Sequence, residues 1–532
     1  MHVTSLSPPA SIREHSLLRV LRRGERLLGR GASASATFSR WRLSIFLTGL
    51  AVVVSLYRLG EYTTGNSAVA VFLIGFLIVA AYHNRLEHRI HRLRLWTDVK
   101  RRHLARLRLD WSSLHPAPTV TADGHLYARD LDLLGPHSLL HLLDTTASTQ
   151  GRARLASWLL TQPPSESSWT ERRRLIRELT RLTLFRDRLG VHARLLGDEE
   201  LSGQRLTAVM QHELHVPRLH IVLPIQALLA LTTLTLGIAS LLHWMPGYWM
   251  FSFGLYALIY FQTDQGEELL EHAVGLHHEV EKLGVVLRYL ESQARRPGSA
   301  LAAACRPLTE FDTAPSAVIR HLAWALYGAS VKAHPLIHLA LNALCPWDLF
   351  FTFRLQQFQR RIRALLPRWL DCLAEVEAAS AGATFAYLHP TYAWPSLRTE
   401  PGIRASQLGH PLIPPASRVA NDFSVSGLGT IHLVTGSNMS GKSTFLRTLG
   451  LNLCLAQAGA PVCAAAFEWS WSRLACCIRV DDSLDAGLSF FYAEVKRLKT
   501  ILSATEDRTA PPVLFLIDEI FKGTNNRERL IG

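Results

Sequence analysis

The sequence lacks the cysteine patterns that predict disulfides or zinc sites. Its seven cysteines are scattered over 532 residues, with no C-x-x-C and no histidine pair at zinc-ligand spacing. Disulfide-rich and zinc-binding domains place their cysteines in pairs, so this distribution excludes both and favours a reducing compartment. The 24 histidines lie mostly among arginines, where a solvated helix face explains them better than a metal site.

Acidic residues are outnumbered by basic ones. The chain has 57 Lys and Arg against 43 Asp and Glu, a formal charge of +14, which favours nucleic acid, acidic lipid or nucleotide as partners. The basic residues 1–42 lack the apolar start of a secretory signal peptide, so we do not expect one. A chain of this length has room for two to four domains with sizeable cores.

Two apolar runs predict a first transmembrane hairpin at residues 43–83. Leu43–Tyr57 and Ala68–Tyr82 contain no formal charge, and a short polar turn separates them. Each run is near the lower limit of about 17 residues for a span. Arginines crowd both outer ends, so the positive-inside rule places these ends in the cytoplasm. A soluble helical hairpin is the alternative, although neither run has the polar face that it would need.

The same arrangement recurs at residues 219–262. Ile221–Leu242 has no formal charge over 22 residues, a turn follows, and Tyr248–Phe261 is apolar again. Trp244 and Trp249 flank the turn, as membrane-interface anchors do. We therefore expect an integral membrane protein of bacterial inner-membrane type, with four spans and with its larger regions in the cytoplasm.

Apolar residues after the second hairpin repeat with alternating steps of four and three, the pattern of a coiled-coil seam. Two such series suggest a long antiparallel lever, with a kink expected at Pro367. Two core helices of an ordinary helical domain also fit the pattern. The series are Leu269, Ala273, Leu276, Val280, Leu283, Leu287, Leu290 and Phe351, Leu355, Phe358, Ile362, Leu365, Trp369, Cys372.

A phosphate-binding loop is indicated by the stretch TGSNMSGKST. Gly436, Gly441, Lys442 and Ser443 fit G-x-x-x-x-G-K-[ST], in which backbone N–H groups surround a phosphate at a helix N-terminus. Lys442 would reach the β- and γ-phosphates, and Ser443 would bind Mg²⁺. The context agrees, because Ile431–Val434 predicts a preceding strand and a helical pattern follows. A glycine-rich helix cap without a ligand is the alternative.

An acidic strand end follows downstream in VLFLIDE, residues 513–519. Five apolar residues predict a strand buried on both faces, and ligands bind at the carboxyl ends of such strands. Asp518 would bind Mg²⁺ through water, and Glu519 would orient the attacking water. Together with the loop, these carboxylates predict nucleotide hydrolysis, with Glu519 and Lys442 as the catalytic residues.

These segments resemble the MutS mismatch-repair ATPases. TGSNMSGKST is similar to the phosphate loop of that family, and residues 518–528, DEIFKGTNNRE, to its acidic strand end. Residues 482–495, DSLDAGLSFFYAEV, resemble its signature segment. Leu142–Pro164 resembles the start of its core or lever domain, and Gly409–Pro411 its short H-P element.

The resemblance implies an ATP hydrolase that uses Mg²⁺ and works as a homodimer. Ser489 would face the γ-phosphate in the site of the partner subunit, and Val419 falls where the family contacts adenine. Mg²⁺ would bind at Ser443 and Asp518. The residues expected to bind ATP are Gly436, Ser437, Asn438, Met439, Ser440, Gly441, Lys442, Ser443, Thr444, Ser489 and Val419.

The departures from the family bear on function. The domain that reads mismatches has no counterpart, and the second hairpin lies where the DNA clamp would be. Our interpretation is a membrane-anchored MutS-like ATPase that couples ATP to dimer and lever movement, with sequence-independent DNA binding. The basic residues Arg85–Arg102 would contact acidic lipid headgroups. A transport ATPase of the ABC kind and a non-catalytic ATP-binding scaffold are the alternatives.

The predicted fold is multi-domain. An α-helical lever and core region carries two transmembrane hairpins and precedes an α/β P-loop ATPase domain of the ABC or MutS type, which we expect to be incomplete in this sequence. The predicted regions are a basic segment (1–42), the first hairpin (43–83), a helical core (84–218), the second hairpin (219–262), lever helices (263–388) and the ATPase domain (389–532).

Overall fold

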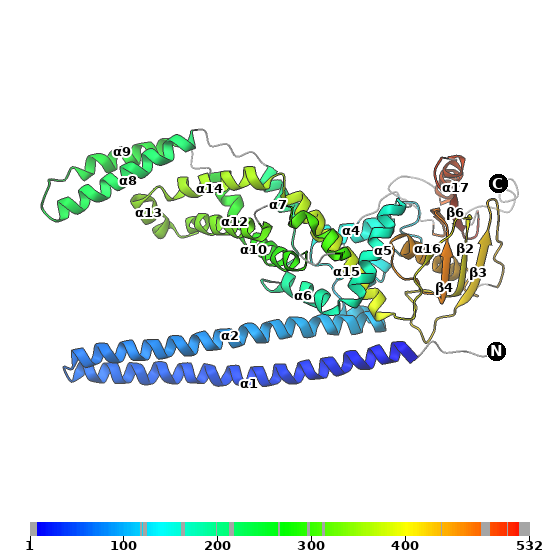
Figure 1. The fold of residues 1–532 in the computed structure, drawn as a ribbon, viewed down its shortest axis with the longest axis horizontal. Helices are drawn as coiled ribbons and strands as arrows, with labels where there is room; N and C mark the ends of the chain where they lie inside the picture. Colours follow the sequence, from blue (N-terminus) through cyan, green and yellow to red (C-terminus); the bar gives the residue numbers. More distant parts are fainter. Residues whose placement is uncertain are drawn as a thin grey trace.

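The computed structural model is an elongated, mostly helical, multi-domain molecule with a small sheet region near its C-terminus (Figure 1). It describes residues 8–117, 120, 125–160, 165–197, 199–211, 218–263, 267–294, 298–310, 314–437, 439–479, 490–507 and 509–520. The helices are α1 Pro8–Arg58, α2 Tyr62–Arg108, α3 Leu139–Leu143, α4 Thr149–Leu160, α5 Glu166–Arg181, α6 Thr183–Arg194, α7 Gly203–Gln211, α8 Leu219–Leu241, α9 Trp249–Gln262, α10 Glu267–Ala294, α11 Ala300–Ala304, α12 Pro315–Ala329, α13 Pro335–Leu344, α14 Trp347–Ile362, α15 Leu366–Leu388, α16 Lys442–Gln457 and α17 Phe490–Glu506.

The first two helices form one long antiparallel hairpin. α1 ends at Arg58, Gly60 takes a φ of +80°, and α2 begins at Tyr62. Glycines let the helices approach closely, since a Cβ on Gly49 would lie 2.9 Å from the ring of Phe72. The predicted boundary at residue 42 is absent, because no proline interrupts residues 10–58 and the basic and apolar segments form a single helix.

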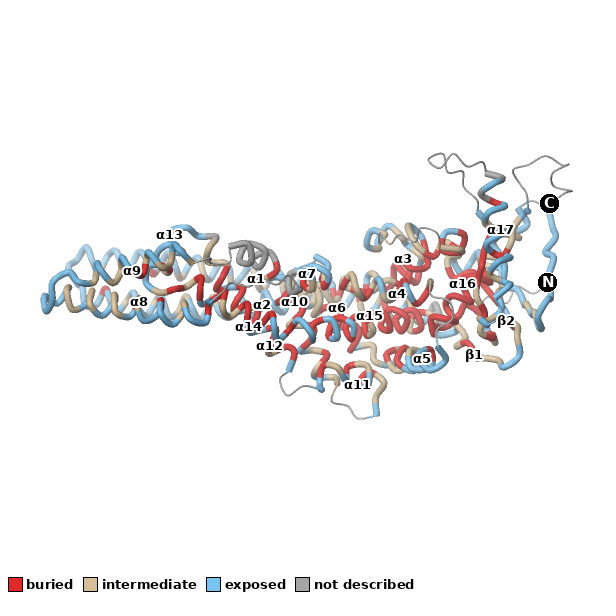
Figure 2. The backbone as a smooth tube through the Cα atoms, turned by 90° about the horizontal axis from the view of Figure 1, so that it is seen from above, coloured by how far each residue is buried: buried red, intermediate tan, exposed pale blue. Residues whose placement is uncertain are grey.

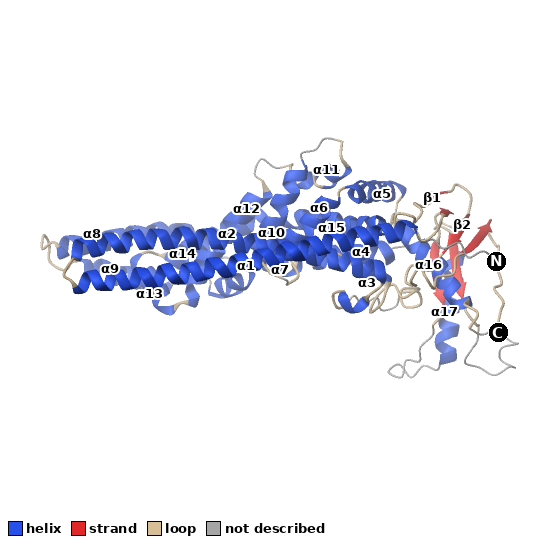
Figure 3. Ribbon diagram, turned by 90° about the horizontal axis from the view of Figure 1, so that it is seen from below, coloured by secondary structure: helices blue, strands red, loops and turns tan. Residues whose placement is uncertain are grey.

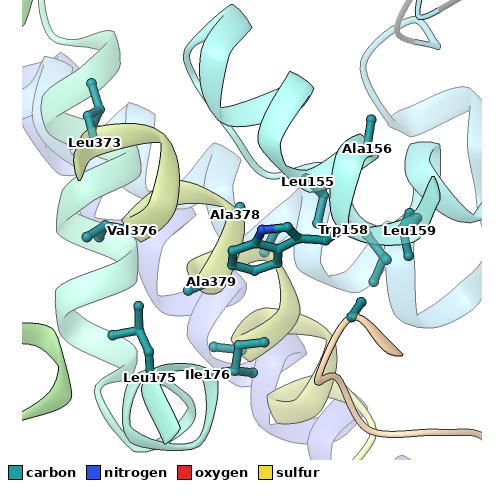
Figure 4. Close-up of a cluster of buried hydrophobic side chains, with 14 of the residues drawn as sticks. Leu155, Ala156, Trp158, Leu159, Leu175, Ile176, Leu373, Val376, Ala378 and Ala379 are labelled. Atoms are coloured by element: carbon teal, nitrogen blue, oxygen red, sulfur yellow. The ribbon is translucent and has the colours of Figure 1, made fainter. Parts of the chain in front are cut away.

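The helical core is centred on α15, around which buried residues are concentrated (Figure 2). Its sequence is rich in alanine, so the neighbouring helices α4 and α5 can pack closely against it. Figure 4 shows the indole of Trp158 beside Ala378 and Ala379, with Ile176 of α5 close by. α15 ends at Leu388, so along the chain the helical core directly precedes the C-terminal sheet region.

The described part of the first predicted seam is buried on α10, which packs against α12. Its residues are Leu276, Val280, Leu283, Leu287 and Leu290. The second series is divided between α14 and α15. The sequence suggested a kink at Pro367, but the structure has a break between the two helices, and Pro367 lies in the first turn of α15. Since α12 packs against both α10 and α14, the arrangement fits the alternative of core helices, and the lever role stays a prediction.

Three described helices are long and apolar enough to cross a membrane: Ile12–Arg58 within α1, α2 and α8. α9, the fourth predicted span, has 14 residues and is short for a span, so the number of spans stays a prediction. The bent pair α13 and α14, with 89° between its helices, is the further apolar candidate. The sequence analysis did not predict a span here, because the coiled-coil pattern already accounted for the apolar residues of α14.

The strands form two small sheets. The first has the order β1 (Ser396–Leu397), β4 (Ala466–Trp469), β2 (Gly402–Leu408), β3 (Asn421–Ser426), and the second pairs β5 (Arg473–Cys477) with β6 (Val513–Ile517) in parallel. Figure 3 shows these strands together at the end of the molecule opposite the α8–α9 turn. The predicted strand Ile431–Val434 is not formed in the described chain. A strand needs a hydrogen-bonded neighbour, and this segment lies outside both sheets with Leu433 87% exposed.

Candidate functional site

The phosphate-loop sequence forms a turn that leads directly into α16. Gly441 is the N-cap residue of the helix and has a φ of +92°, a conformation that favours glycine. Phe445 N–H donates to the Gly441 carbonyl at 2.9 Å, which closes the first helical turn. A Cβ on Gly436 would lie 2.8 Å from Ser440 Oγ, so a larger residue there would have to displace that hydroxyl. The backbone N–H groups of the first turn of α16 are therefore available to an anion.

Ser443 and Asp518 meet at this site although 75 residues separate them. Ser443 Oγ donates a hydrogen bond of 2.5 Å to Asp518 Oδ2. Asp518 directly follows β6, and its N–H donates to the Cys477 carbonyl at 2.9 Å, so the parallel sheet fixes its position. A hydroxyl and a carboxylate side by side are oxygen ligands of the kind that Mg²⁺ prefers.

Lys442 and Glu519 lie next to this pair along the chain. Lys442 Nζ donates to the carbonyls of Gly436 at 2.9 Å and Ser437 at 3.0 Å, so its ammonium group lies over the loop. Glu519 is exposed and has a φ of +47°. The structure thus brings Lys442, Ser443, Asp518 and Glu519 together, while their catalytic and metal-binding roles stay predictions.

Other predicted site residues are dispersed or lie outside the described chain. Met439 is fully exposed with a φ of +63°, and Thr444 is exposed on the first turn of α16. Val419 is 74% exposed, and its contact with adenine stays a prediction. Asn438 and Ser489 lie outside the described residues, as do residues 482–489 of the predicted signature segment.

A cluster of opposite charges connects the site to a loop of the helical region, and the sequence reading missed it. Asp130 is fully buried, pairs with Arg497 of α17 at 3.0 Å, and accepts hydrogen bonds from the N–H groups of Ile478 and Arg479. Burial raises the pKa of Asp130, and Arg497 opposes that rise. The two acids of the stretch RDLD, residues 129–132, were a signal, but their partners lie about 350 residues away in sequence.

The H-P element forms a buried polar cluster beside α16. Burial and the nearby Arg418 lower the pKa of His410 to about 4, so its imidazole is neutral at physiological pH. Arg418 donates to the Tyr392 hydroxyl at 2.8 Å and to the Ile413 carbonyl at 3.0 Å. Asn452 of α16 donates to the Gly409 carbonyl at 3.0 Å, which ties the element to the helix that begins at the phosphate loop.

A second candidate site is the end of the molecule farthest from the sheets, which we call the apolar end. It comprises the α1–α2 turn region, the α8–α9 hairpin and α13, which all lie towards that end, with the α1–α2 hairpin separate from the other two in Figure 1. Large apolar side chains are exposed on all three: Phe46, Leu50, Leu73, Leu77, Leu228, Leu231, Phe251, Leu336 and Leu339. Exposed apolar surface on this scale is typical of membrane or partner contact.

Polar side chains hold α13 and α14 to the α8–α9 hairpin. Tyr256 Oη donates to the Asn342 carbonyl at 2.5 Å, and Gln226 Nε2 donates to the Tyr256 carbonyl at 3.1 Å. His338 Nε2 lies 2.7 Å from Asp348 Oδ2. These bonds fix the apolar surface of α13 beside the hairpin.

Comparison with known proteins identifies the C-terminal region. Residues 432–530 match the family model of MutS domain V. The chain is 35% identical over 162 residues to the DNA mismatch repair protein MutS of Chlorobaculum tepidum, and 38% identical over 120 residues to the endonuclease MutS2 of Thermus thermophilus. These alignments cover 29% and 22% of this chain, and 17% and 15% of the relatives. The chain therefore spans less than a fifth of the length of these relatives.

Proposed function

We propose that this MutS-like protein binds ATP with Mg²⁺ at the turn before α16 and hydrolyses it. The observation that carries the proposal is the contact between Ser443 Oγ and Asp518 Oδ2. A hydroxyl that begins a helix and a carboxylate that ends a strand form the metal-ligand pair of phosphate-loop ATPases. Ser443 and Asp518 would hold Mg²⁺, which would supply positive charge to neutralise the phosphates.

The chain's own residues have separate tasks in this reaction. Lys442 binds the phosphate oxygens. To do so, its ammonium group exchanges its hydrogen bonds to the carbonyls of Gly436 and Ser437 for bonds to the phosphate. Glu519 holds and orients the attacking water. The N–H groups at the start of α16 face the phosphates and stabilise their negative charge.

Nucleotide binding and turnover can be measured separately on the purified full chain. Lys442→Ala should weaken ATP binding, while Glu519→Gln should keep binding and lose turnover by about 10²-fold or more. Lys499→Ala and Glu506→Gln are matched controls, since both residues are exposed on α17. ATP binding by the parent chain without turnover would show that a non-catalytic scaffold, with ATP as structural ligand, is the better description, and turnover unchanged in Glu519→Gln would remove Glu519 from the reaction.

The relatives named as mismatch-repair proteins support DNA as a partner of this chain. Basic residues on α2 also suit acidic lipid headgroups, which is our proposal for Arg85–Arg102 because they follow an apolar segment. If DNA phosphates are bound, affinity falls with salt by about one log-log slope unit per phosphate. Duplex-shift and liposome-flotation assays over a salt series distinguish the two partners.

The apolar end supports insertion in a membrane. α8 is 23 residues long, and only 6% of its apolar window is buried in the protein. α1 and α2 carry apolar segments of the same kind, so the hairpins would lie in the bilayer with the ATPase region outside it. A transport ATPase is the rival reading of this arrangement, and substrate-stimulated ATP turnover in proteoliposomes would favour it.

The family resemblance further supports a homodimer with composite ATP sites. Glu519→Gln should trap the dimer in the presence of ATP, because bound nucleotide is not turned over. Analytical ultracentrifugation with and without ATP tests this, and a mass that does not depend on ATP or on protein concentration would argue against a nucleotide-driven dimer.

A further inference from the structure

A small cavity of about 40 Å³ lies where α2, α6 and α15 meet. His103 of α2, Arg186 of α6 and Ser380 of α15 all line it, and each is more than nine-tenths buried. His103 Nδ1, Arg186 Nε and Ser380 Oγ have no hydrogen-bond partner among the described residues. Buried polar atoms are nearly always paired, so three unpaired atoms on one cavity indicate that something binds there.

The cavity is strongly positive. Arg102, Arg106 and Arg194 line it as well. Arg106 donates to the carbonyls of Leu142 and Asp144, and Arg186 to the carbonyl of Leu179, so both guanidinium groups have neutral backbone partners.

The pKa values of these groups reflect their burial. Burial lowers the pKa of Arg106 and of Arg186 to about 10. Burial, reinforced by the charges of Lys100 and Arg106, holds the pKa of His103 well below its usual range, so the ring is neutral and can donate from Nδ1.

The described acids around the cavity are engaged with other groups. Glu377, on the lining itself, accepts hydrogen bonds from Ser148 Oγ and from the N–H of Ala147. The ion pairs of the other acids are Asp98 with Arg102 at 2.6 Å, Asp187 with Lys100 at 2.6 Å, and Asp144 with Arg152 at 2.8 Å.

We propose that this cavity binds a tetrahedral oxyanion of the phosphate class through Arg186 Nε, His103 Nδ1 and Ser380 Oγ. Its volume of about 40 Å³ is far below the roughly 300 Å³ that a drug-sized or nucleotide ligand needs, so the cavity suits only a small ion. Guanidinium groups match the geometry of phosphate oxygens, and the three donors belong to three different helices.

The site would join parts of the chain that are distant in sequence. α2 is the returning arm of the first hairpin, and α15 is the last helix before the sheet region. An anion held between them stabilises their packing, because a ligand that binds only the folded arrangement favours it. The site is independent of the nucleotide loop and of the proposed ATP hydrolysis.

Binding of radiolabelled orthophosphate to the purified full chain tests the proposal. Arg186→Gln should weaken binding by about 10- to 100-fold, the effect of losing a hydrogen bond to a charged group. Ser380→Ala removes one donor with little risk to folding and should weaken binding by a smaller factor. Arg188→Gln, an exposed arginine on the same helix, should leave binding unchanged.

Lys442→Ala distinguishes this site from the nucleotide loop. Phosphate binding that survives Lys442→Ala and is lost in Arg186→Gln supports the cavity, and the opposite pattern overturns it. No binding by the parent chain, or equal binding by parent, Arg186→Gln and Ser380→Ala, would mean that the cavity holds water only. Competition by glycerol 3-phosphate as strong as that by orthophosphate would overturn the assignment to a cavity that admits only a small inorganic oxyanion.

Discussion

Trp169 Nε1 donates a hydrogen bond of 2.8 Å to the carbonyl oxygen of Ala456, which lies 287 residues later in the chain. Trp169 belongs to α5 of the helical core, and Ala456 belongs to the last turn of α16. At its other end, α16 begins with Lys442, directly after the phosphate-loop turn. One helix therefore connects the candidate nucleotide site to the helical core, and a movement at the turn can reach the core through it.

Replacing Trp169 should loosen this connection. Trp169→Phe loses the hydrogen bond to Ala456 and part of the packing against Trp469 and Trp471, whose rings lie 6.0 and 5.8 Å away. We expect a loss of about 1–3 kcal/mol in the free energy of unfolding. Urea unfolding measures it, with Trp324→Phe as control, because Trp324 is half exposed on α12. Equal midpoints for the two variants would contradict the prediction.

Glu377 should make stability depend on pH. Burial raises the pKa of this carboxyl from 4.5 to about 7, against the opposing effect of hydrogen bonds from Ser148 and Ala147. Between these values the folded chain holds a proton that the unfolded chain has released, so stability falls as pH rises through this window. The full effect is about 3 kcal/mol, at about 1.4 kcal/mol per pKa unit.

Glu377→Gln isolates this effect, because the amide keeps the shape of the side chain and does not titrate. Unfolding midpoints should be measured from acid to neutral pH in a buffer without phosphate or sulfate. The stability of the parent relative to the variant should decrease across the window. If the curves of unfolding midpoint against pH run parallel for the parent and the variant, the pKa of Glu377 does not change on folding.

A charge in the middle of α8 tests the apolar end. Leu228→Arg places a guanidinium group where the proposed bilayer is deepest, at a cost of about 2.5–3.5 kcal/mol for insertion. The variant should shift from the membrane fraction towards soluble or aggregated protein. Leu184→Arg is the matched control, because Leu184 is as exposed as Leu228 but lies on α6, away from the apolar end. Recovery of the parent chain without detergent in the soluble fraction would refute membrane insertion altogether.

Gly402 should tolerate no side chain at the start of β2. Its φ is +142°, and a Cβ would lie 2.3 Å from the Val425 carbonyl oxygen on the neighbouring strand β3. We expect Gly402→Ala to cost about 3 kcal/mol or more, from backbone strain and a forced shift of the strands. Gly429→Ala separates the two causes, since its φ is +75° but no atom lies within 4 Å, and it should cost about 1–2 kcal/mol. Similar losses of stability in the two variants would show that the contact with Val425 relaxes easily.

The sequence by itself determined the local features of the site. The glycines and the lysine of the turn before α16 and the run of apolar residues in β6 act within a few residues of one another, so spacing alone predicted a turn into a helix and a strand that ends in Asp518. The match of residues 432–530 to MutS domain V agrees with that reading. The seam on α10 was also predictable, because its period depends only on helix geometry.

The tertiary structure decided what depends on partners distant in sequence. Ile431–Val434 has the composition of a strand but remains unpaired in the described chain, since a strand forms only where a neighbour supplies hydrogen bonds. Whether the apolar repeats of α10 and α14 pair with each other was settled by α12, which packs against both. The meeting of His103, Arg186 and Ser380 around one cavity could not be predicted either, because burial and charge depend on how three helices pack, and no local pattern records that.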